Sequence, residues 1–493
     1  MIDDGDVQPG GKMFLGVHGR SAESSTYFLA QRIFLAWLGV TYLMAFASLG
    51  VQATGLYGAR GILPISDYLQ AAEKVLGPKS YSLLPSLLWF NSSNFALQLL
   101  CWGGALLSLA LIFGIAVFPV SILLWLFYLS FVTVGQEFLS FQWDTLLLET
   151  GFLAIFIAPL HLRFKSSPAS GPPFIFVLLM RWLLFRLIFL SGLVKLASGD
   201  LSWRNWTALT FHYETQPLPT WIGWYVHQLP AVFHKFSTGV LFFVELLVPF
   251  LIYLRRRAPL LAAAAITGLQ ILIALTGNYC FFNFLTIGLC FWLIDDSSWP
   301  SVFRSKISKM DTLPPNTILS SFGTGFKTLA AVIIFMLAFI KIPPLEPFHL
   351  VSHYGLFAVM TTERPEIIIE GSNDGVEWLA YEFRYKPGDP KKKPAFAEPH
   401  QPRLDWQMWF AALGDYHSNH WLLKFCERLL KGSPEVLALL ESNPFKGHPP
   451  KYIRAVVYDY RFSNLSQKRR DGVWWVRERK GLYCPMLQLG PRR

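Results

Sequence analysis

The feature that most constrains this chain is a series of long apolar runs spread over residues 28–342. Several approach the roughly 20 residues that a helix needs to cross the hydrocarbon core of a bilayer. Only 15% of the residues are charged, whereas a typical soluble protein has about 25%. The runs occupy 28–50, 95–117, 119–138, 143–160, 174–197, 237–254, 259–275, 278–294 and 326–342. Because some are short, we predict a polytopic α-helical membrane bundle of about 7–9 spans.

Basic residues in the short connections indicate how the bundle is oriented. Residues 255–257 are three consecutive arginines between two apolar runs, and short loops rich in Lys and Arg generally face the cytoplasm. Alternation from this cluster places the N-terminal tail 1–27 and the loops 161–173 and 295–325 on the cytoplasmic side, and the loops 51–94 and 198–236 and the C-terminal region outside. The tail lacks the apolar core of a signal peptide, so we expect the first run to be an uncleaved insertion signal.

The composition becomes polar and charged after the last apolar run, which divides the chain into a membrane domain, 28–345, and a C-terminal domain, 346–493. The segment EIIIEGSNDGVEWLAYEFRY predicts a β-hairpin that turns at Asn373–Gly375. Further strands are predicted at 452–462 and 473–479, and short helices at 421–430 and 434–440. We therefore expect a β-rich α+β domain, for which a β-sandwich remains one alternative.

Within the apolar region, the stretch GQEFLSFQWDTLLLETG at 135–151 is unusually polar. A carboxylate at membrane depth is costly, by about 2.5–3.5 kcal/mol on insertion scales. On a continuous helix, Glu137 and Asp144 would share one face, and Gln142 and Glu149 would share another. Lipid therefore cannot surround this segment. Its place between two apolar runs favours an outer turn beneath a loop over the middle of the bundle.

The next long run carries basic groups that could neutralise these acids, namely Arg181, Arg186 and Lys195. Glu245 lies in a further run and could join them. Ion pairs that fix the helix packing are the simpler interpretation. The alternative is a proton-handling site, because a desolvated lysine can act as a base. The expected intramembrane polar network comprises Gln136, Glu137, Gln142, Asp144, Glu149, Arg181, Arg186 and Lys195.

No cofactor signature accompanies these residues, so the sequence assigns no catalytic residue and predicts no cofactor. The common hydrolase, P-loop and dinucleotide-binding motifs do not occur. The five cysteines lack the spacing of a metal or redox site. Cys426 and Cys484 would share the outer compartment, where a disulfide could form. The net charge of +11 is explained by basic loops and by anionic membrane lipid as a partner, rather than by nucleic acid.

A second constellation lies in the C-terminal region, in the segment HQPRLDWQMWF. It contains His400, Arg403, Asp405, Trp406 and Trp409. Arg and Trp are enriched where proteins bind partners, but the arginine could equally pair with Asp405 or another acid. The segment is too aromatic to lie bare on a surface. We expect a partly buried structural motif whose edge contacts either the membrane domain or a client protein.

Several of these segments resemble the lipase maturation factor family. The longest are FQWDTLLLETGFLAIF at 141–156 and PHQPRLDWQMWFAALG at 399–414, joined by GLYGARGILP, SGLVKLASGDLSW and GVWWVRE. The resemblance extends over residues 28–485. It implies a membrane protein of the endoplasmic reticulum that helps secreted lipases fold and assemble into active dimers. The expected function is therefore non-enzymatic, with secreted lipases as clients.

A weaker resemblance links the membrane half to the vitamin K-dependent gamma-carboxylase. It rests on the Glu-bearing helix and on Gly192, Lys195 and Trp203. This resemblance implies the alternative of a membrane-embedded enzyme with Lys195 as a candidate base. A transporter is a third interpretation, but no inverted repeat or pair of broken helices supports it.

Overall fold

The computed structural model describes residues 27–490 except 160–166, 169–171, 256, 302–311, 314–328 and 341. The N-terminal half contains α1 (Phe28–Gly50), α2 (Ala53–Tyr57), α3 (Ile65–Leu76), η1 (Gly77–Lys79), α4 (Ser80–Leu83), η2 (Leu87–Trp89), α5 (Asn94–Ile112), α6 (Val117–Val132), η3 (Gln136–Leu139), α7 (Gln142–Ile157), β1 (Ser167–Pro168), α8 (Phe174–Ala197), α9 (Leu201–Arg204), α10 (Ala208–Thr215), α11 (Trp221–His227) and α12 (Ala231–Phe242).

The remaining elements follow in chain order. They are η4 (Phe243–Leu247), η5 (Val248–Tyr253), α13 (Ala258–Thr276), α14 (Phe282–Cys290), η6 (Phe291–Leu293), η7 (Asp296–Ser298), β2 (Thr312–Leu313), η8 (Pro343–Phe348), β3 (Pro365–Ser372), β4 (Leu379–Ala380), α17 (Arg403–Ala412), α18 (His420–Leu430), α19 (Pro434–Leu437), β5 (Tyr452–Phe462), α20 (Leu465–Asp471) and β6 (Trp475–Leu487). Residues 329–337 are also helical.

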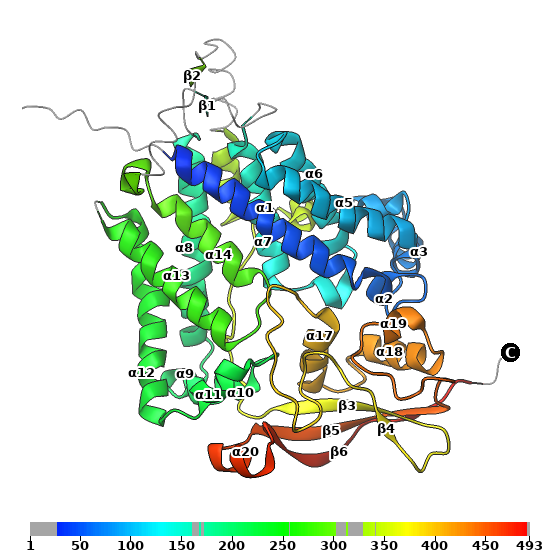
Figure 1. Cartoon of the computed structure of the whole chain (residues 1–493). Helices are drawn as coiled ribbons and strands as arrows, with labels where there is room; N and C mark the ends of the chain where they lie inside the picture. The colour runs from blue at the N-terminus through cyan, green and yellow to red at the C-terminus, as the bar shows by residue number, and fades with distance from the viewer. Residues whose placement is uncertain are drawn as a thin grey trace, which may run out of the picture.

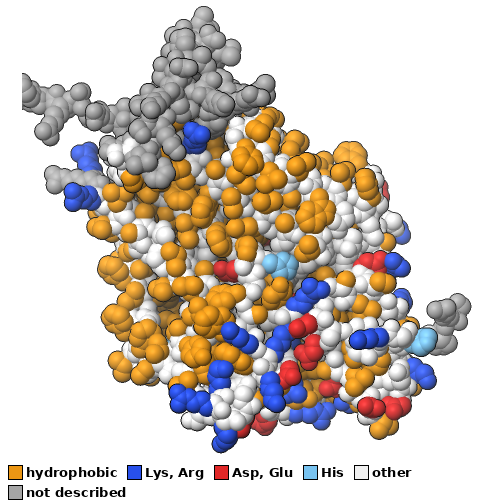
Figure 2. Space-filling view, viewed as in Figure 1, with side chains coloured by type: hydrophobic (Ala, Val, Ile, Leu, Met, Phe, Trp, Pro, Cys, Tyr) orange, Lys and Arg blue, Asp and Glu red, His pale blue; other side chains and the backbone are white. Residues whose placement is uncertain are grey.

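The predicted helical membrane bundle is confirmed. Within the described residues, five helices are long and apolar enough to cross a membrane: α1, α5, α8, α13 and the continuous segment Ala231–Tyr253. Two shorter apolar helices, Val117–Val132 and Phe282–Leu293, lie among them. Each of the nine predicted apolar runs contains helix. Hydrophobic side chains cover most of the face over these helices, whereas charged groups gather at the other end of the molecule (Figure 2).

Small residues allow two of the long helices to approach closely. A Cβ atom on Gly39 of α1 would lie 2.8 Å from the Ile112 side chain, and one on Gly104 of α5 would lie 2.7 Å from Phe46. Helices inside a membrane gain little from the hydrophobic effect between them, so their association depends on close packing of this kind. The pair α1 and α5 thus forms a tight crossing on one side of the bundle.

The helix that begins at Ala231 does not continue regularly. Its middle widens into one π-helical turn, η4, and then tightens into the 3₁₀ turn η5. Pro249 lies at the start of η5, where it lacks the N–H that a regular helix would use. Wide turns of this type are rare and are often found at functional sites. Here the turn carries Glu245.

The C-terminal region contains a four-stranded antiparallel sheet in the order β4-β3-β5-β6. The predicted hairpin is confirmed, with Glu370 opposite Ala380 and Gly375 at a φ of +75° in its turn. Helices α17 and α18 lie between this sheet and the membrane helices (Figure 1). The described part of the C-terminal region therefore forms one sheet covered by helices, whereas the β-sandwich alternative required a second sheet facing it.

The sheet domain and the helical bundle share one hydrophobic core. Leu49 and Phe138 from the helical region lie in the same buried cluster as Trp421 and Ile369 from the C-terminal region. The rings of Phe138 and Trp421 meet edge to face at 5.3 Å. Such packing resembles the interior of a single domain, so the C-terminal region is fixed against the bundle.

Candidate functional site

The polar stretch at 135–151 is broken into two elements. Gln136 has a positive φ of 48° at the start of η3, and Phe141 is extended before α7 begins. The faces expected for one continuous helix therefore do not apply, and the break agrees with the place of this stretch between two apolar runs. Glu137 is exposed on η3, while Asp144 and Glu149 are 0% and 1% exposed on α7. Asp144 lies in the first turn of α7, where unpaired N–H groups favour an acid.

Asp144 forms an ion pair with Arg403, the first residue of α17. The two guanidinium nitrogens Nη1 and Nη2 donate to Oδ2 and Oδ1 at 3.0 and 2.9 Å. Both side chains are completely buried. Arg403 also donates to the carbonyl of Phe138 at 2.6 Å. This two-pronged geometry is the strongest arrangement available to an arginine and a carboxylate, and it joins the C-terminal domain to the bundle.

Amide and hydroxyl groups complete this joint on the side of α1. Gln52 accepts the backbone N–H of Arg403 at 2.9 Å and donates to the carbonyl of Gln401 at 2.8 Å. The Ser48 hydroxyl accepts the backbone N–H of Gln401 at 2.9 Å. The indole of Trp143 donates to the side chain of Gln401 at 2.8 Å. These bonds tie the chain on either side of Arg403 to the end of α1 and to α7, although the Nε of Arg403 and the amide nitrogen of Gln401 are buried without a partner.

A second ion pair links α7 to α8. Glu149 accepts a hydrogen bond from Arg186 through one oxygen. Its other oxygen accepts the N–H of Ser352 at 2.8 Å and the hydroxyl of Tyr354 at 2.6 Å. Gln142 bonds in both directions to the backbone of Gly355. These contacts hold the segment that follows the last apolar run against α7.

The remaining basic groups have other partners than the sequence led us to expect. Arg181 donates to the carbonyl of Trp292 at 2.9 Å and to the hydroxyl of Tyr27 at 2.8 Å. Lys195 pairs with Glu245. The expected pairing of these two residues with the acids of the 135–151 stretch is therefore wrong. Helix α8 presents its basic groups to different neighbours, so the anticipated network divides into separate pairs.

The 400–409 motif faces the membrane helices and its own domain. His400 Nδ1 lies 2.9 Å from the Ser48 hydroxyl, and burial, with help from Arg403 and then Arg384, lowers the pKa of His400 to about 4. Asp405 does not pair with the arginine but accepts the backbone N–H groups of Tyr385 and Lys386 at 2.8 and 2.9 Å.

The two tryptophans of this motif also point toward the bundle. Trp406 packs edge to face on Trp143 of α7 at 4.8 Å, and Trp409 donates to the carbonyl of Thr215 at 2.8 Å. The indole of Trp409 is 7% exposed and that of Trp406 is 3% exposed. Both rings are therefore parts of the joint, and neither offers a free surface to a partner.

The pair formed by Lys195 and Glu245 lies in a different setting. The ammonium group donates to both carboxylate oxygens at 2.8 and 2.9 Å and to the carbonyl of Ser191 at 3.0 Å. It also lies 5.5 Å from the ring centre of Trp203. All three protons of the ammonium group are thus used. Gly192 permits this pairing, because a Cβ atom there would lie 2.8 Å from both Glu245 and Leu246.

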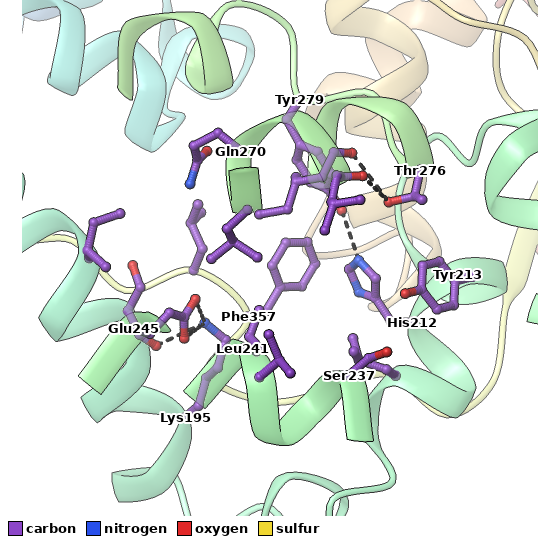
Figure 3. Close-up of a pocket in the computed structure, with 18 of the residues that line it drawn as sticks. Lys195, His212, Tyr213, Ser237, Leu241, Glu245, Gln270, Thr276, Tyr279 and Phe357 are labelled. Atoms are coloured by element: carbon purple, nitrogen blue, oxygen red, sulfur yellow. Dashed lines mark hydrogen bonds and ion pairs between the residues drawn. The ribbon is translucent and has the colours of Figure 1, made fainter. Parts of the chain in front are cut away.

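A cavity of about 380 Å³ lies beside this pair. Figure 3 shows Lys195 and Glu245 on one side of it and His212 on the other, with Phe357 between them. Its lining comes from α8, α10, α12, α13 and the segment after the last apolar run, and is mostly apolar. Pockets of this size, with a few polar groups among apolar ones, are typical of ligand sites.

Hydrogen bonds at the cavity wall fix the protonation of His212. The amide nitrogen of Gln216 donates to the carbonyl of Thr276 at 2.8 Å, so its oxygen accepts the Tyr279 hydroxyl at 2.9 Å. The tyrosine oxygen can then only accept from His212 Nε2, which lies 3.4 Å away. Nδ1 is therefore the unprotonated nitrogen, and it is buried without a hydrogen-bond partner.

Several residues of the joint and the cavity escaped the sequence analysis. They include Ser48, Gln52, Gln216, Gln270, Tyr279, Arg364 and Gln401. Most are neutral, and neutral polar residues give a weak signal in a single sequence. Gln270 was detectable, because it is the one amide in the run 259–275 and polar groups within spans are often functional. Arg364 is fully buried and holds the carbonyls of Glu214 and Pro217 at 2.7 and 2.9 Å.

Among the described residues, no group of His, Cys, Asp and Glu could hold a metal ion. The cysteines there are buried and free. Cys426 and Cys484 belong to the same hydrophobic cluster. A disulfide between them stays a prediction.

A bundle of apolar helices with a C-terminal sheet domain locked onto it defines a polytopic membrane protein. Residues 29–301 match the family described as lipase maturation factor transmembrane domain, and residues 350–485 match the lipase maturation factor C-terminal domain. The chain belongs to the lipase maturation factor family.

Individual relatives agree with this assignment. The chain is 36% identical to lipase maturation factor 2 of Xenopus tropicalis, over 94% of this chain and 83% of the relative. It is 34% identical to lipase maturation factor 1 of Bos taurus, over 95% and 91%, and 35% identical to that of Homo sapiens, over 94% and 89%. No solved structure is significantly similar to the chain.

Proposed function

We propose that this protein is a non-enzymatic folding factor of the endoplasmic reticulum membrane, and that it assists the assembly or export of secreted lipases. Family membership over nearly the whole chain carries this proposal. The geometry agrees with a scaffold, because the buried ion pairs Asp144–Arg403 and Glu149–Arg186 each join separate elements, and both carboxylates accept hydrogen bonds from several protein groups.

We further propose that residues 28–345 form the membrane domain, that the tail 1–27 is cytoplasmic, and that the domain 346–493 is lumenal. An odd number of crossings places the tail and the C-terminal domain on opposite sides of the membrane. The number is nine if α6, α7, α14 and the helix at 329–337 cross in addition to the five candidate spans. Two observations support it. The short strands β1 and β2, from loops assigned to the cytoplasm, pair with each other, and they lie at the end opposite the sheet (Figure 1).

The open edge of the sheet is the surface best suited to clients. Strand β6 ends the strand order and runs for 13 residues. Leu482 and Met486 on it are 57% and 55% exposed. An unpaired edge can accept an extended segment of another chain through main-chain hydrogen bonds. Incompletely folded lipase would present such segments.

The test is co-purification of a secreted lipase with the full-length protein from native membranes. The variant carrying Leu482→Asp and Met486→Asp should lower lipase recovery several-fold. A matched control is Val376→Asp, which is 83% exposed in the hairpin turn away from β6 and should leave recovery unchanged. Failure of any lipase to co-purify with the unaltered protein would contradict the proposed function.

A second candidate function is a membrane-embedded enzyme in which Lys195 acts as the base. The observation that favours it is the position of Lys195 on the cavity wall. Its test is Lys195→Arg, which keeps the positive charge but cannot be deprotonated in proteins. An enzyme should lose all activity at normal protein abundance. Retention of lipase maturation by this variant would exclude the lysine as a base.

A further inference from the structure

The cavity opens toward the surroundings between α12 and α13. Its mouth carries apolar side chains that are partly exposed, including Phe236 at 68%, Val240 at 42% and Leu272 at 60%. These helices belong to the candidate membrane spans. Figure 2 shows hydrophobic side chains over this side of the molecule. A molecule that enters between the two helices therefore comes from the hydrocarbon phase rather than from water.

The lining carries no net charge. Lys195 and Glu245 are the charged side chains that the described part of the chain contributes, and they neutralise each other. His212 is neutral, because burial and then the charge of Lys195 lower its pKa to about 4. A charged head group would have to give up its hydration without gaining a counter-ion. The cavity therefore disfavours fatty acids and quaternary amines alike.

Two polar groups nevertheless lack partners. His212 Nδ1 is an unpaired acceptor, because the proton of the ring is on Nε2. The amide oxygen of Gln270, whose side chain is only 3% exposed, is unpaired as well. Both residues line the cavity (Figure 3). A buried acceptor without a partner is unfavourable, so a ligand that donates a hydrogen bond would relieve the cost. A hydroxyl group donates and is uncharged.

We propose that this cavity binds a neutral amphiphile from the bilayer, with its hydroxyl head group donating to His212 Nδ1 and its apolar chain leaving between α12 and α13. The volume of about 380 Å³ is at the lower end of the range for small-molecule pockets, about 300–1,000 Å³. A small head group with the first part of one chain fits this size, and the rest of the chain would lie outside among the lipids.

The experiment uses full-length protein in phosphatidylcholine nanodiscs and three photoreactive probes with the same saturated chain. One ends in a primary alcohol, one in a carboxylate and one in a trimethylammonium group. The alcohol should label peptides from α12 and α13 at least about fivefold more strongly than either charged probe, since burial of an unpaired charge is disfavoured. Excess unlabelled long-chain alcohol should compete.

Substitutions in the cavity lining test whether the alcohol probe binds within the cavity. Val240→Trp should fill its mouth and abolish the labelling, and His212→Phe should reduce it about fivefold through loss of one hydrogen bond. Leu261→Trp is the matched control, because Leu261 is 63% exposed on α13 and lies outside the cavity lining. Where Val240→Trp lowers the unfolding midpoint, Ser237→Phe replaces it. Equal labelling by the carboxylate probe, or full labelling of the filled variant, would overturn the proposal.

Discussion

The ion pairs Asp144–Arg403 and Lys195–Glu245 both hold opposite charges inside the helical region, but their surroundings differ. The first is completely buried, and Arg403 also donates to the carbonyl of Phe138. The second borders a cavity of about 380 Å³, near two polar atoms that have no partner. The same chemistry therefore serves two purposes. A closed pair fixes the packing of two domains, and an open pair forms one wall of a binding site.

The largest effect on stability is expected at Arg403. Arg403→Met leaves Asp144 charged and buried, which should lower the free energy of unfolding by about 3–5 kcal/mol. The measurement is the thermal unfolding midpoint of the purified protein, together with its abundance in membranes. Adding Asp144→Leu removes the stranded charge and should restore part of the loss. A single variant that melts like the unaltered protein would show that the joint is not closed.

A smaller effect is expected at Gly192. In Gly192→Ala, the new Cβ atom would lie 2.8 Å from Glu245 and Leu246, so α8 and η4 must separate. Overpacking of this kind should destabilise the protein by about 1–3 kcal/mol. The unfolding midpoint measures it, and Gly268→Ala is the control, because a Cβ atom there meets nothing within 4 Å. Equal effects of the two substitutions would contradict the close approach.

Lys195→Met tests whether the second pair is open. It should lower the free energy of unfolding by about 1–2 kcal/mol, less than Arg403→Met, because the cavity gives the Glu245 carboxyl space to reorient and to take up a proton, whereas Asp144 is completely enclosed. The comparison of the two unfolding midpoints in the same detergent gives the answer. If loss of Lys195 is as damaging as loss of Arg403, the cavity does not give the carboxyl this freedom and the distinction between the pairs fails.

The smallest effect is expected on the pH dependence of stability. The pKa of His400 is lowered from 6.5 to about 4, so the unfolded chain binds a proton more readily than the folded one. The stability that neutral His400 provides is complete above pH 6.5 and is lost as the pH falls toward 4. Relative to the unaltered protein, His400→Gln should gain about 1 kcal/mol between about pH 7.5 and pH 5.5. Parallel unfolding midpoints at the two pH values would contradict this.

Much of the fold was readable from the sequence because membrane spans and turns are local signals. The runs 28–50 and 174–197 coincide with α1 and α8, and the strand at 452–462 coincides with β5. The widened turn η4 was not predictable, since one glutamate in the apolar run at 237–254 does not indicate a change of helix type. Its irregularity arises where Glu245 reaches Lys195 on another helix, and such tertiary contacts leave no local pattern.

The candidate site, like the fold, could be predicted only in part from the sequence. The sequence identified Asp144, Glu149 and Arg186 as charges that need partners, because charge at membrane depth is unusual, and it gave Arg403 only as a residue that could pair with Asp405 or another acid. It could not pair Asp144 with Arg403, since the two lie 259 residues apart and belong to different domains. The cavity was invisible for another reason. Its walls are ordinary apolar residues, and an empty space is a property of packing that composition does not record.

That separation along the chain has a consequence for biosynthesis. Asp144 leaves the ribosome 259 residues before Arg403, which corresponds to about 10–50 s at usual rates of translation. Throughout this interval a carboxylate of the nascent membrane domain has no arginine. The bundle therefore cannot reach its final packing during synthesis, and its last step waits for the C-terminal domain to fold and deliver the missing charge.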